Sequence, residues 1–215
     1  EDAPVSLYMD SPYSISKIIG EFYGNYFQTQ SGLPFVKARF QNVYGPGEVL
    51  GAGRWRGTPH TVWRNVTPTF IWKSLNGEPL PVENEGIATR DFIFVDDIVD
   101  GLVRCALHGT VGEVYNLASG KETSIRELAE SIIEHTGNTA GIEWRPARTW
   151  DNSGKRFGDP QKAKAELGFE TKTDFADGLQ TTINWTRDNY DRIQNAIAKH
   201  ADRMPMPQAA AREES

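Results

Sequence analysis

Tyr13 and Lys17 stand four residues apart in the pentad Tyr-Ser-Ile-Ser-Lys near the start of the chain. On a helix, residues with this spacing lie on one face, with their Cβ atoms about 5–6 Å apart. A neighbouring ammonium favours the charged form of an acid, so Lys17 is placed to stabilise a Tyr13 phenolate. A tyrosinate can take the proton of a hydroxyl group while hydride leaves the same carbon. The pair therefore fits acid/base chemistry on an alcohol, although Tyr and Lys at this spacing also arise by chance on many helices.

The segments around this pair have the patterns that would position it. Ile, Phe and Tyr recur every three or four positions through residues 13–30, between Pro12 and Gly32, which predicts a helix. Residues 35–40 are rich in apolar and β-forming side chains and predict a buried strand that ends at Phe40. A glycine-rich loop is expected over residues 45–57.

Strands and helices alternate through the rest of the chain, which predicts an α/β protein. We expect strands at 91–95, 113–118 and 142–144, and helices at 62–75, from 96, from 124, at 160–167 and from 175 to about 200. Asp96 and Asp97 are expected to cap the second of these helices. Ser124 and Glu127 form the pattern of a capping box for the third, which Gly137 should close.

Charge and cysteine content narrow the class of protein. The 215 residues include 23 Lys plus Arg and 29 Asp plus Glu, giving a net charge of −6, which argues against nucleic acid as a partner. The single cysteine, Cys105, excludes a disulfide framework, and the four histidines show no ligand spacing, so we expect no metal site. No apolar run approaches the roughly 18 residues of a membrane span. We therefore expect a cytoplasmic protein that acts without a membrane.

Four stretches in order resemble the landmarks of the extended short-chain dehydrogenase/reductase family, and within it most closely the NAD-dependent nucleotide-sugar epimerases and dehydratases. They are Ser-Pro-Tyr-Ser-Ile-Ser-Lys at 11–17, Arg-Phe-Gln-Asn-Val-Tyr-Gly-Pro-Gly at 39–47, Arg-Asp-Phe-Ile-Phe-Val-Asp-Asp at 90–97 and Tyr-Asn-Leu at 115–117. The resemblance covers about residues 11–185. It implies that Tyr13 is the catalytic acid/base, that Lys17 binds the nicotinamide ribose of NAD, and that Phe40 and Gln41 contact the nicotinamide end.

The resemblance also implies a site for a nucleotide-diphosphate sugar. Asn42 matches a residue that meets the sugar diphosphate, and Arg90 matches an arginine that binds the diphosphate, a task suited to a planar guanidinium. Arg148 lies in Arg-Thr-Trp-Asp, which resembles an Arg-x-Gly-Asp stretch that binds the nucleotide, although Trp150 replaces the glycine. Arg156 is a second candidate nearby.

Each of these positions has another explanation. Arg90 could pair with Asp91 or Asp96 on the surface, and Asn42 could cap the turn before Gly45. For Arg148 and Arg156 a surface role is as well supported as phosphate binding, because the segment around them is hard to align with the family.

The expected organisation is that of the C-terminal part of a Rossmann-type domain interleaved with a second, substrate-binding domain. Residues 1–43 and 96–118 would belong to the NAD-binding domain, residues 44–95 and 119–200 to a mixed α/β substrate domain, and 201–215 to a disordered tail. Neither the glycine-rich turn of a dinucleotide-binding fold nor the family's catalytic Ser or Thr lies before Tyr13. We therefore expect a longer polypeptide by about 100 residues or more, and we expect these 215 residues alone not to retain NAD.

The expected reaction is epimerisation, in which a hexose hydroxyl is oxidised to a transient keto sugar and hydride returns with inversion. The alternatives are a nucleotide-sugar 4,6-dehydratase or decarboxylase and, from another class, a non-catalytic sensor of the same fold. The helix of residues 13–30 is aromatic on its other face, so we expect a homodimer formed through it.

Overall fold

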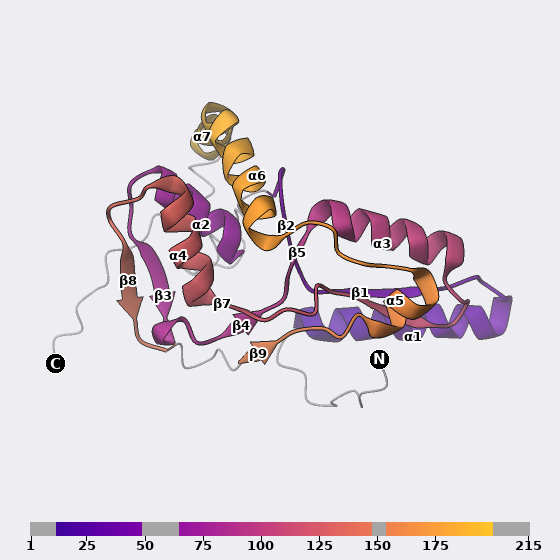
Figure 1. Cartoon of the computed structure of the whole chain (residues 1–215). Coiled ribbons are helices and arrows are strands. Elements are labelled where there is room, and N and C mark those ends of the chain that lie inside the picture. The colour runs from indigo at the N-terminus through magenta and orange to yellow at the C-terminus, as the bar shows by residue number, and fades with distance from the viewer. Residues whose placement is uncertain (1–11, 49–64, 148–153, 200–215) are drawn as a thin grey trace. The chain divides into compact units, whose positions relative to one another are not determined.

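The computed structural model describes residues 12–48, 65–147 and 154–199 (Figure 1). Helices and strands alternate, and the strand pairs include the parallel pairs β1–β6 and β3–β8. The predicted α/β class is therefore confirmed. The chain divides into two compact units. The first unit comprises Glu1–Val43, Asp91–Glu122 and Arg156–Thr173, and the second comprises Tyr44–Arg90, Thr123–Lys155 and Asp174–Ser215.

The first unit is built on a parallel strand pair with helices beside it. Its elements are α1 (Pro12–Ser31), β1 (Lys37–Phe40), β5 (Phe92–Phe94), α3 (Val95–His108), β6 (Val114–Leu117) and α5 (Gln161–Leu167). β1 and β6 run parallel, with Lys37 opposite Val114 and Phe40 opposite Leu117. Because the strands are parallel and in register, their carboxyl ends meet at one edge.

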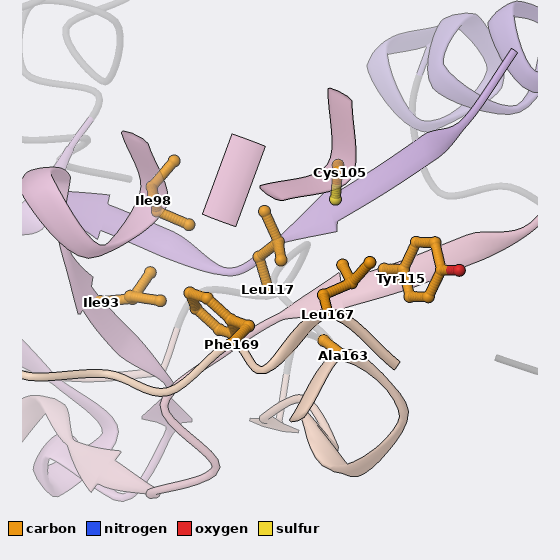
Figure 2. Packing of buried hydrophobic residues seen from close by; sticks show 8 residues of the cluster. All are labelled: Ile93, Ile98, Cys105, Tyr115, Leu117, Ala163, Leu167 and Phe169. Carbon is orange, nitrogen blue, oxygen red and sulfur yellow. The ribbon is translucent and has the colours of Figure 1, made fainter. Parts of the chain in front are cut away.

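A buried apolar cluster joins the strands of this unit to α3 and α5 (Figure 2). Its members are Ile93, Ile98, Cys105, Tyr115, Leu117, Ala163, Leu167 and Phe169. Gly101 lets α3 approach closely, because a Cβ there would lie 2.9 Å from both Leu117 Cδ1 and Phe169 Cε2. Burial of these side chains is the main stabilising contribution to the unit.

The second unit contains two small sheets and four α-helices among its described residues. Its elements are α2 (Val66–Leu75), β3 (Leu80–Glu83), the 3₁₀ turn η3 (Asn84–Gly86), β4 (Thr89–Arg90), β7 (Thr123–Ser124), α4 (Ile125–Thr136), β8 (Ile142–Arg145), α6 (Phe175–Asp188) and α7 (Tyr190–Lys199). β3 pairs in parallel with β8, and β4 lies between β7 and β9 (Lys155–Arg156). β2 (Asn42–Tyr44) pairs with β5, and both β2 and β9 cross a boundary between the units.

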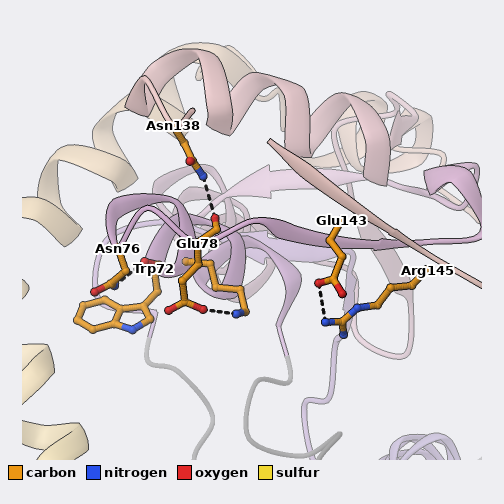
Figure 3. A network of polar contacts seen from close by, with 7 residues as sticks. Trp72, Asn76, Glu78, Asn138, Glu143 and Arg145 are labelled. Atoms are coloured by element: carbon orange, nitrogen blue, oxygen red, sulfur yellow. Dashed lines mark hydrogen bonds and ion pairs between the residues drawn. The ribbon is translucent and has the colours of Figure 1, made fainter. Parts of the chain in front are cut away.

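Polar contacts secure the turns around β3 and β8 in the second unit (Figure 3). Asn138 Nδ2 donates a hydrogen bond of 2.9 Å to the carbonyl of Glu78, which joins the end of α4 to the turn before β3. Asn76 Nδ2 donates to the carbonyl of Trp72 at 2.7 Å and closes α2. Arg145 and Glu143 form an ion pair of 2.7 Å on β8.

Of the two helix starts predicted from capping residues, that of α4 is confirmed and that of α3 is not. The capping box at Ser124 is confirmed, and Gly137 ends α4 in the left-handed conformation. The prediction that Asp96 and Asp97 cap α3 is wrong, because the N-cap is Phe94 and makes no side-chain cap bond. Asp97 instead accepts hydrogen bonds from the backbone N–H groups of residues 172 and 173, at 2.9 and 3.2 Å.

Other elements differ in extent from the sequence prediction. The final helix is two helices, because α6 ends at Asp188 and α7 begins at Tyr190. The helix predicted at 62–75 has described residues from Val66, with Pro68 in its first turn, where a proline removes no helical hydrogen bond. Of the predicted glycine-rich loop, residues 49–57 lie outside the described residues, as does the whole tail 201–215. None of the described helices is long and apolar enough to cross a membrane.

The observed units share the boundary after Val43 with the expected domains and differ from them further along the chain. β5 groups with the first unit, and residues 156–173 return to it after the chain has left. The reason is packing: Ile93 of β5 and Phe169 of the returning segment both belong to the apolar cluster of Figure 2.

Candidate active site

Tyr13 and Lys17 lie on one face of α1, as their spacing predicts. Lys17 Nζ is 5.1 Å from the centre of the Tyr13 ring. Both side chains are exposed, Tyr13 to 65%. The phenol and the ammonium are thus neighbours that a ligand can reach.

Three contacts fix α1 against the segment of β1. Arg39 donates two hydrogen bonds of 2.7 Å to the carboxylate of Glu21, and Lys37 Nζ donates one of 2.8 Å to Asn25 Oδ1. Gly24 is buried against Phe35, where a Cβ would lie 1.9 Å from the ring carbon Cε1. A side chain at position 24 would therefore hold the helix away from the strand.

These contacts set the register between the helix and the strand. Asn25 of α1 is bonded to Lys37 of β1. Glu21, four residues earlier on the helix, is bonded to Arg39, two residues later on the strand. Four helical residues span about 6 Å and two strand residues about 6.6 Å, so the steps match. One further step places Lys17 level with Gln41. The helix therefore carries its Tyr–Lys face toward the carboxyl end of β1.

The three residues at that end of β1 are at least partly accessible. Phe40, the last residue of the strand, is 51% exposed, Gln41 is half-buried, and Asn42 is exposed. Asn42 opens β2, and its backbone N–H donates a hydrogen bond of 3.0 Å to the carbonyl of Asp91. An apolar ring and two amides thus stand together at the edge where ligands of parallel α/β sheets bind.

Arg90 lies in the second unit, at the end of β4. Its Nη1 donates hydrogen bonds of 2.6 Å to the carbonyl of Thr89 and 3.0 Å to that of Gly154. The carboxylate of Asp91, one of the partners considered from the sequence, instead accepts hydrogen bonds from residues 119, 120 and 158. The contacts of Arg90 with the carbonyls of Thr89 and Gly154 orient its guanidinium, and a neutral carbonyl does not cancel the charge.

The other two predicted arginines differ in what the structure says of them. Arg156 is the last residue of β9 and is exposed. Arg148 lies outside the described residues. The structure therefore groups five predicted site residues, Tyr13, Lys17, Phe40, Gln41 and Asn42, with Arg156 in the first unit and assigns Arg90 to the second.

Sequence reasoning missed two carboxylates that the fold buries, Asp91 fully and Glu48 in part. Asp91 was weighed only as a partner of Arg90, yet it is a completely buried carboxylate. Glu48, in the second unit, accepts a hydrogen bond of 2.6 Å from Asn65 Nδ2, and its Oε2 is buried without a hydrogen-bond partner in the described part of the chain. Burial raises the pKa of Glu48 to about 7, and the hydrogen bond from Asn65 opposes this rise. No sequence signal marks Glu48, because its burial depends on the fold.

Comparison with known proteins decides the family. Residues 1–118 match the NAD dependent epimerase/dehydratase family. The chain belongs to this family. Among curated relatives of this epimerase/dehydratase chain, a UDP-glucose 4-epimerase of Mycolicibacterium smegmatis is 33% identical over 187 residues, which cover 87% of this chain and 56% of the relative. A dTDP-glucose 4,6-dehydratase of Streptomyces niveus is 31% identical over 193 residues, covering 88% of this chain and 52% of that protein.

The structure of the Bordetella bronchiseptica enzyme WbmF in complex with NAD+ and UDP is also similar. It matches with a TM-score of 0.85 and 61% identity, over 95% of this chain and 61% of the enzyme. This epimerase/dehydratase chain thus spans about half the length of the two curated relatives and under two thirds of WbmF.

Proposed function

We propose that the protein, at its natural length, is an NAD-dependent epimerase of nucleotide-diphosphate sugars. Family membership supports the reaction class, and the exposed Tyr13–Lys17 pair of α1, with Lys17 Nζ 5.1 Å from the centre of the Tyr13 ring, is the observation that carries the assignment. Similarity to an enzyme complexed with NAD+ and UDP supports a uridine nucleotide. The cytoplasmic location expected from composition stays a prediction.

The side chains at the edge of β1 suit the cofactor chemically. Lys17 offers an exposed ammonium with three donors, which fits ribose hydroxyls, and Phe40 offers an exposed ring that fits a nicotinamide face. NAD, when bound, supplies the acceptor that takes hydride from the sugar carbon and returns it. Tyr13, Lys17, Phe40 and Gln41 are the residues of this chain proposed to contact it.

The chain's own contribution to the reaction is acid/base chemistry and binding. The Tyr13 phenolate takes the hydroxyl proton as the carbon–oxygen bond becomes a carbonyl, and returns it when the hydroxyl is restored. The Lys17 ammonium stabilises the phenolate. Asn42, Arg90, Arg148 and Arg156 are proposed to bind the sugar diphosphate and nucleotide, since guanidinium groups bind phosphates bidentately.

Replacement of Tyr13 with Phe tests the proposal. Tyr13→Phe should abolish turnover while the dissociation constant for the nucleotide sugar, measured by calorimetry, changes less than about 2-fold, because only the proton-transferring hydroxyl is lost. Tyr23→Phe is the matched control, since it removes a hydroxyl from a tyrosine of α1 that is 63% exposed and keeps the apolar ring that the dimer proposed below would bury. Unchanged turnover in Tyr13→Phe would refute the assignment.

A 4,6-dehydratase is the second candidate, because a dehydratase relative is nearly as similar as the epimerase relative. The two reactions differ in their products. An epimerase leaves the mass of the sugar unchanged, whereas a dehydratase removes one water. Mass spectrometry of the product therefore separates them.

We also propose a homodimer formed through α1. Its outer face carries Ile19, Phe22, Tyr23 and Tyr26, which line an apolar pocket and are each roughly half or more exposed. A second copy would cover this surface with the same side chains, as a two-fold interface requires. Sedimentation should show a dimer for the wild type and a monomer for Phe22→Glu, which places a charge in the interface. A dimeric Phe22→Glu would place the contact elsewhere.

A further inference from the structure

One buried carboxylate connects the loop that follows β6 to the backbone at Gly158. Asp91 Oδ1 accepts hydrogen bonds from Ser119 N at 2.9 Å and Ser119 Oγ at 2.7 Å. Its Oδ2 accepts from Gly120 N at 2.9 Å and Gly158 N at 3.3 Å. Because Asp91 has no exposed surface, these four donors replace the water that an isolated carboxylate would need.

Gly158 contacts both the Asp91 carboxylate and the Gln41 amide. A Cβ on Gly158 would lie 2.8 Å from Gln41 Nε2 and 2.7 Å from Ala118 Cβ. The backbone of Gly158 therefore lies directly against the Gln41 amide and the end of β6. Since Gly158 N is hydrogen-bonded to Asp91, the carboxylate sets how closely this backbone approaches Gln41.

The main chain of Asp91 is hydrogen-bonded to Asn42, the residue that follows Gln41 at the same edge. Its carbonyl accepts the hydrogen bond from Asn42 N at 3.0 Å. Asp91 is thus bonded directly to Asn42 and, through Gly158, is one contact away from Gln41. All four residues belong to the first unit.

We propose that Asp91 is a positioning residue, which fixes Gln41 through Gly158 at the edge where cofactor and sugar meet. This role rests on the proposed function, because that function assigns Gln41 to NAD and Asn42 to the substrate. The edge itself is where parallel α/β sheets bind ligands. Asp91 acts on the bound molecules only through other residues.

Asp97 supplies a matched comparison for a purely structural clamp. It is also a buried aspartate of the first unit, and it accepts hydrogen bonds from two backbone N–H groups, those of Lys172 and Thr173. Neither of these hydrogen bonds involves Gln41, Ala118 or Gly158. Asp97→Asn therefore measures the effect of losing hydrogen bonds between a buried carboxylate and backbone N–H groups, without a contact to Gln41.

The test compares Asp91→Asn, Gly158→Ala and Asp97→Asn in the protein at its natural length. Asn presents an NH₂ donor where Asp91 offered an acceptor to backbone N–H groups, so hydrogen bonds are lost. In Gly158→Ala, the new Cβ at 2.8 Å must move the Gln41 amide by about 0.6 Å to reach an ordinary contact of 3.4 Å. Misplacement of about 1 Å can cost 10²-fold in rate, so we expect about a 10-fold effect.

Three measurements are made on each variant: the dissociation constant for NAD, kcat, and the thermal midpoint. Asp91→Asn and Gly158→Ala should each weaken NAD binding and lower kcat by about 10-fold. Asp97→Asn should lower the thermal midpoint by an amount similar to Asp91→Asn, with NAD affinity and kcat within about 2-fold of wild type. Equal losses of thermal midpoint with NAD affinity and kcat unchanged in Asp91→Asn and Gly158→Ala would overturn the proposal.

A double-mutant cycle keeps the proposal testable if Asp91→Asn does not fold. In a Gln41→Ala background, Gly158→Ala has no amide to displace and only its contact with Ala118 Cβ remains, so its effect on NAD affinity should be smaller than in the wild-type background. An undiminished effect in that background would contradict the proposal. A wild type that bound no NAD would overturn the proposed function and this role together, whereas a wild type that bound NAD normally beside unaffected variants would overturn this role alone.

Discussion

Replacing Glu48 with Gln should stabilise the protein above pH 7. Burial raises the pKa of Glu48 from its ordinary value of 4.5 to about 7, against the hydrogen bond from Asn65. Glutamine keeps an oxygen that can accept that bond, which is 2.6 Å long, and removes the ionisable group. Folding then no longer places a charge in a poorly solvated position.

The magnitude follows from the shift in pKa. A rise of about 2.5 units, at 1.36 kcal/mol per unit, sets an upper limit of about 3.4 kcal/mol. Partial exposure of the side chain reduces this value, so we expect about 1–3 kcal/mol. The folded state binds the proton more tightly than the unfolded state. The wild type therefore has its full stability below pH 4.5 and loses this contribution as the pH rises through about 7.

Urea unfolding at intervals from pH 5 to pH 8 checks this expectation. The difference in the free energy of unfolding between Glu48→Gln and wild type should be small at pH 5 and should grow to its full value by pH 8. Glu85→Gln is the control, because that side chain is 82% exposed. A difference that stayed constant with pH, or a variant less stable than wild type at pH 8, would refute the reasoning.

Three further outcomes test other parts of the structure. Arg90→Ala should raise the dissociation constant for the nucleotide sugar about 10- to 100-fold in calorimetry, since a hydrogen bond to a charged group contributes about 1.5–3 kcal/mol; an unchanged constant would return Arg90 to a structural role. Ser124→Ala should lower the free energy of unfolding by about 1 kcal/mol, because it removes the hydrogen bond from Glu127 N to Ser124 Oγ, and no loss would contradict the cap. Gly24→Ala should cost about 1–3 kcal/mol by pushing α1 away from Phe35, and wild-type stability in urea would show that the contact is not close.

The parts of the fold that sequence predicted are those whose determinants are local. α1 follows from apolar spacing over 20 residues, and α4 from the capping box at Ser124 and the terminal Gly137. β4, β7 and β9 have two residues each. No period can mark a strand so short, and β4 exists because Thr89 and Arg90 pair with Ser124 and Thr123. Such strands depend on the tertiary fold and cannot be predicted from the sequence pattern.

The candidate site divides in the same way. Tyr13 and Lys17 could be recognised because one helical turn brings them together, whereas Phe40, Gln41 and Asn42 are candidates only through the family resemblance of residues 39–47. The partners of Asp91 lie 28, 29 and 67 residues further along the chain. Only the fold brings such distant backbone N–H groups to one carboxylate, so the frame around the site could not be read from spacing.

Arg90 and Asp91 are adjacent in the sequence, yet their side chains have different hydrogen-bond partners. Both lie in the extended stretch that runs from β4 into β5, where successive side chains point to opposite faces. Asp91 is accordingly buried and accepts hydrogen bonds from backbone N–H groups. Arg90 is half-buried and donates hydrogen bonds to the carbonyls of Thr89 and Gly154. A neighbouring carboxylate on the opposite face of an extended segment is poorly placed to neutralise the guanidinium. The Arg-Asp dipeptide therefore spans the boundary between the two units: the Asp91 carboxylate accepts hydrogen bonds from residues of the first, and the Arg90 guanidinium donates to backbone carbonyls of the second.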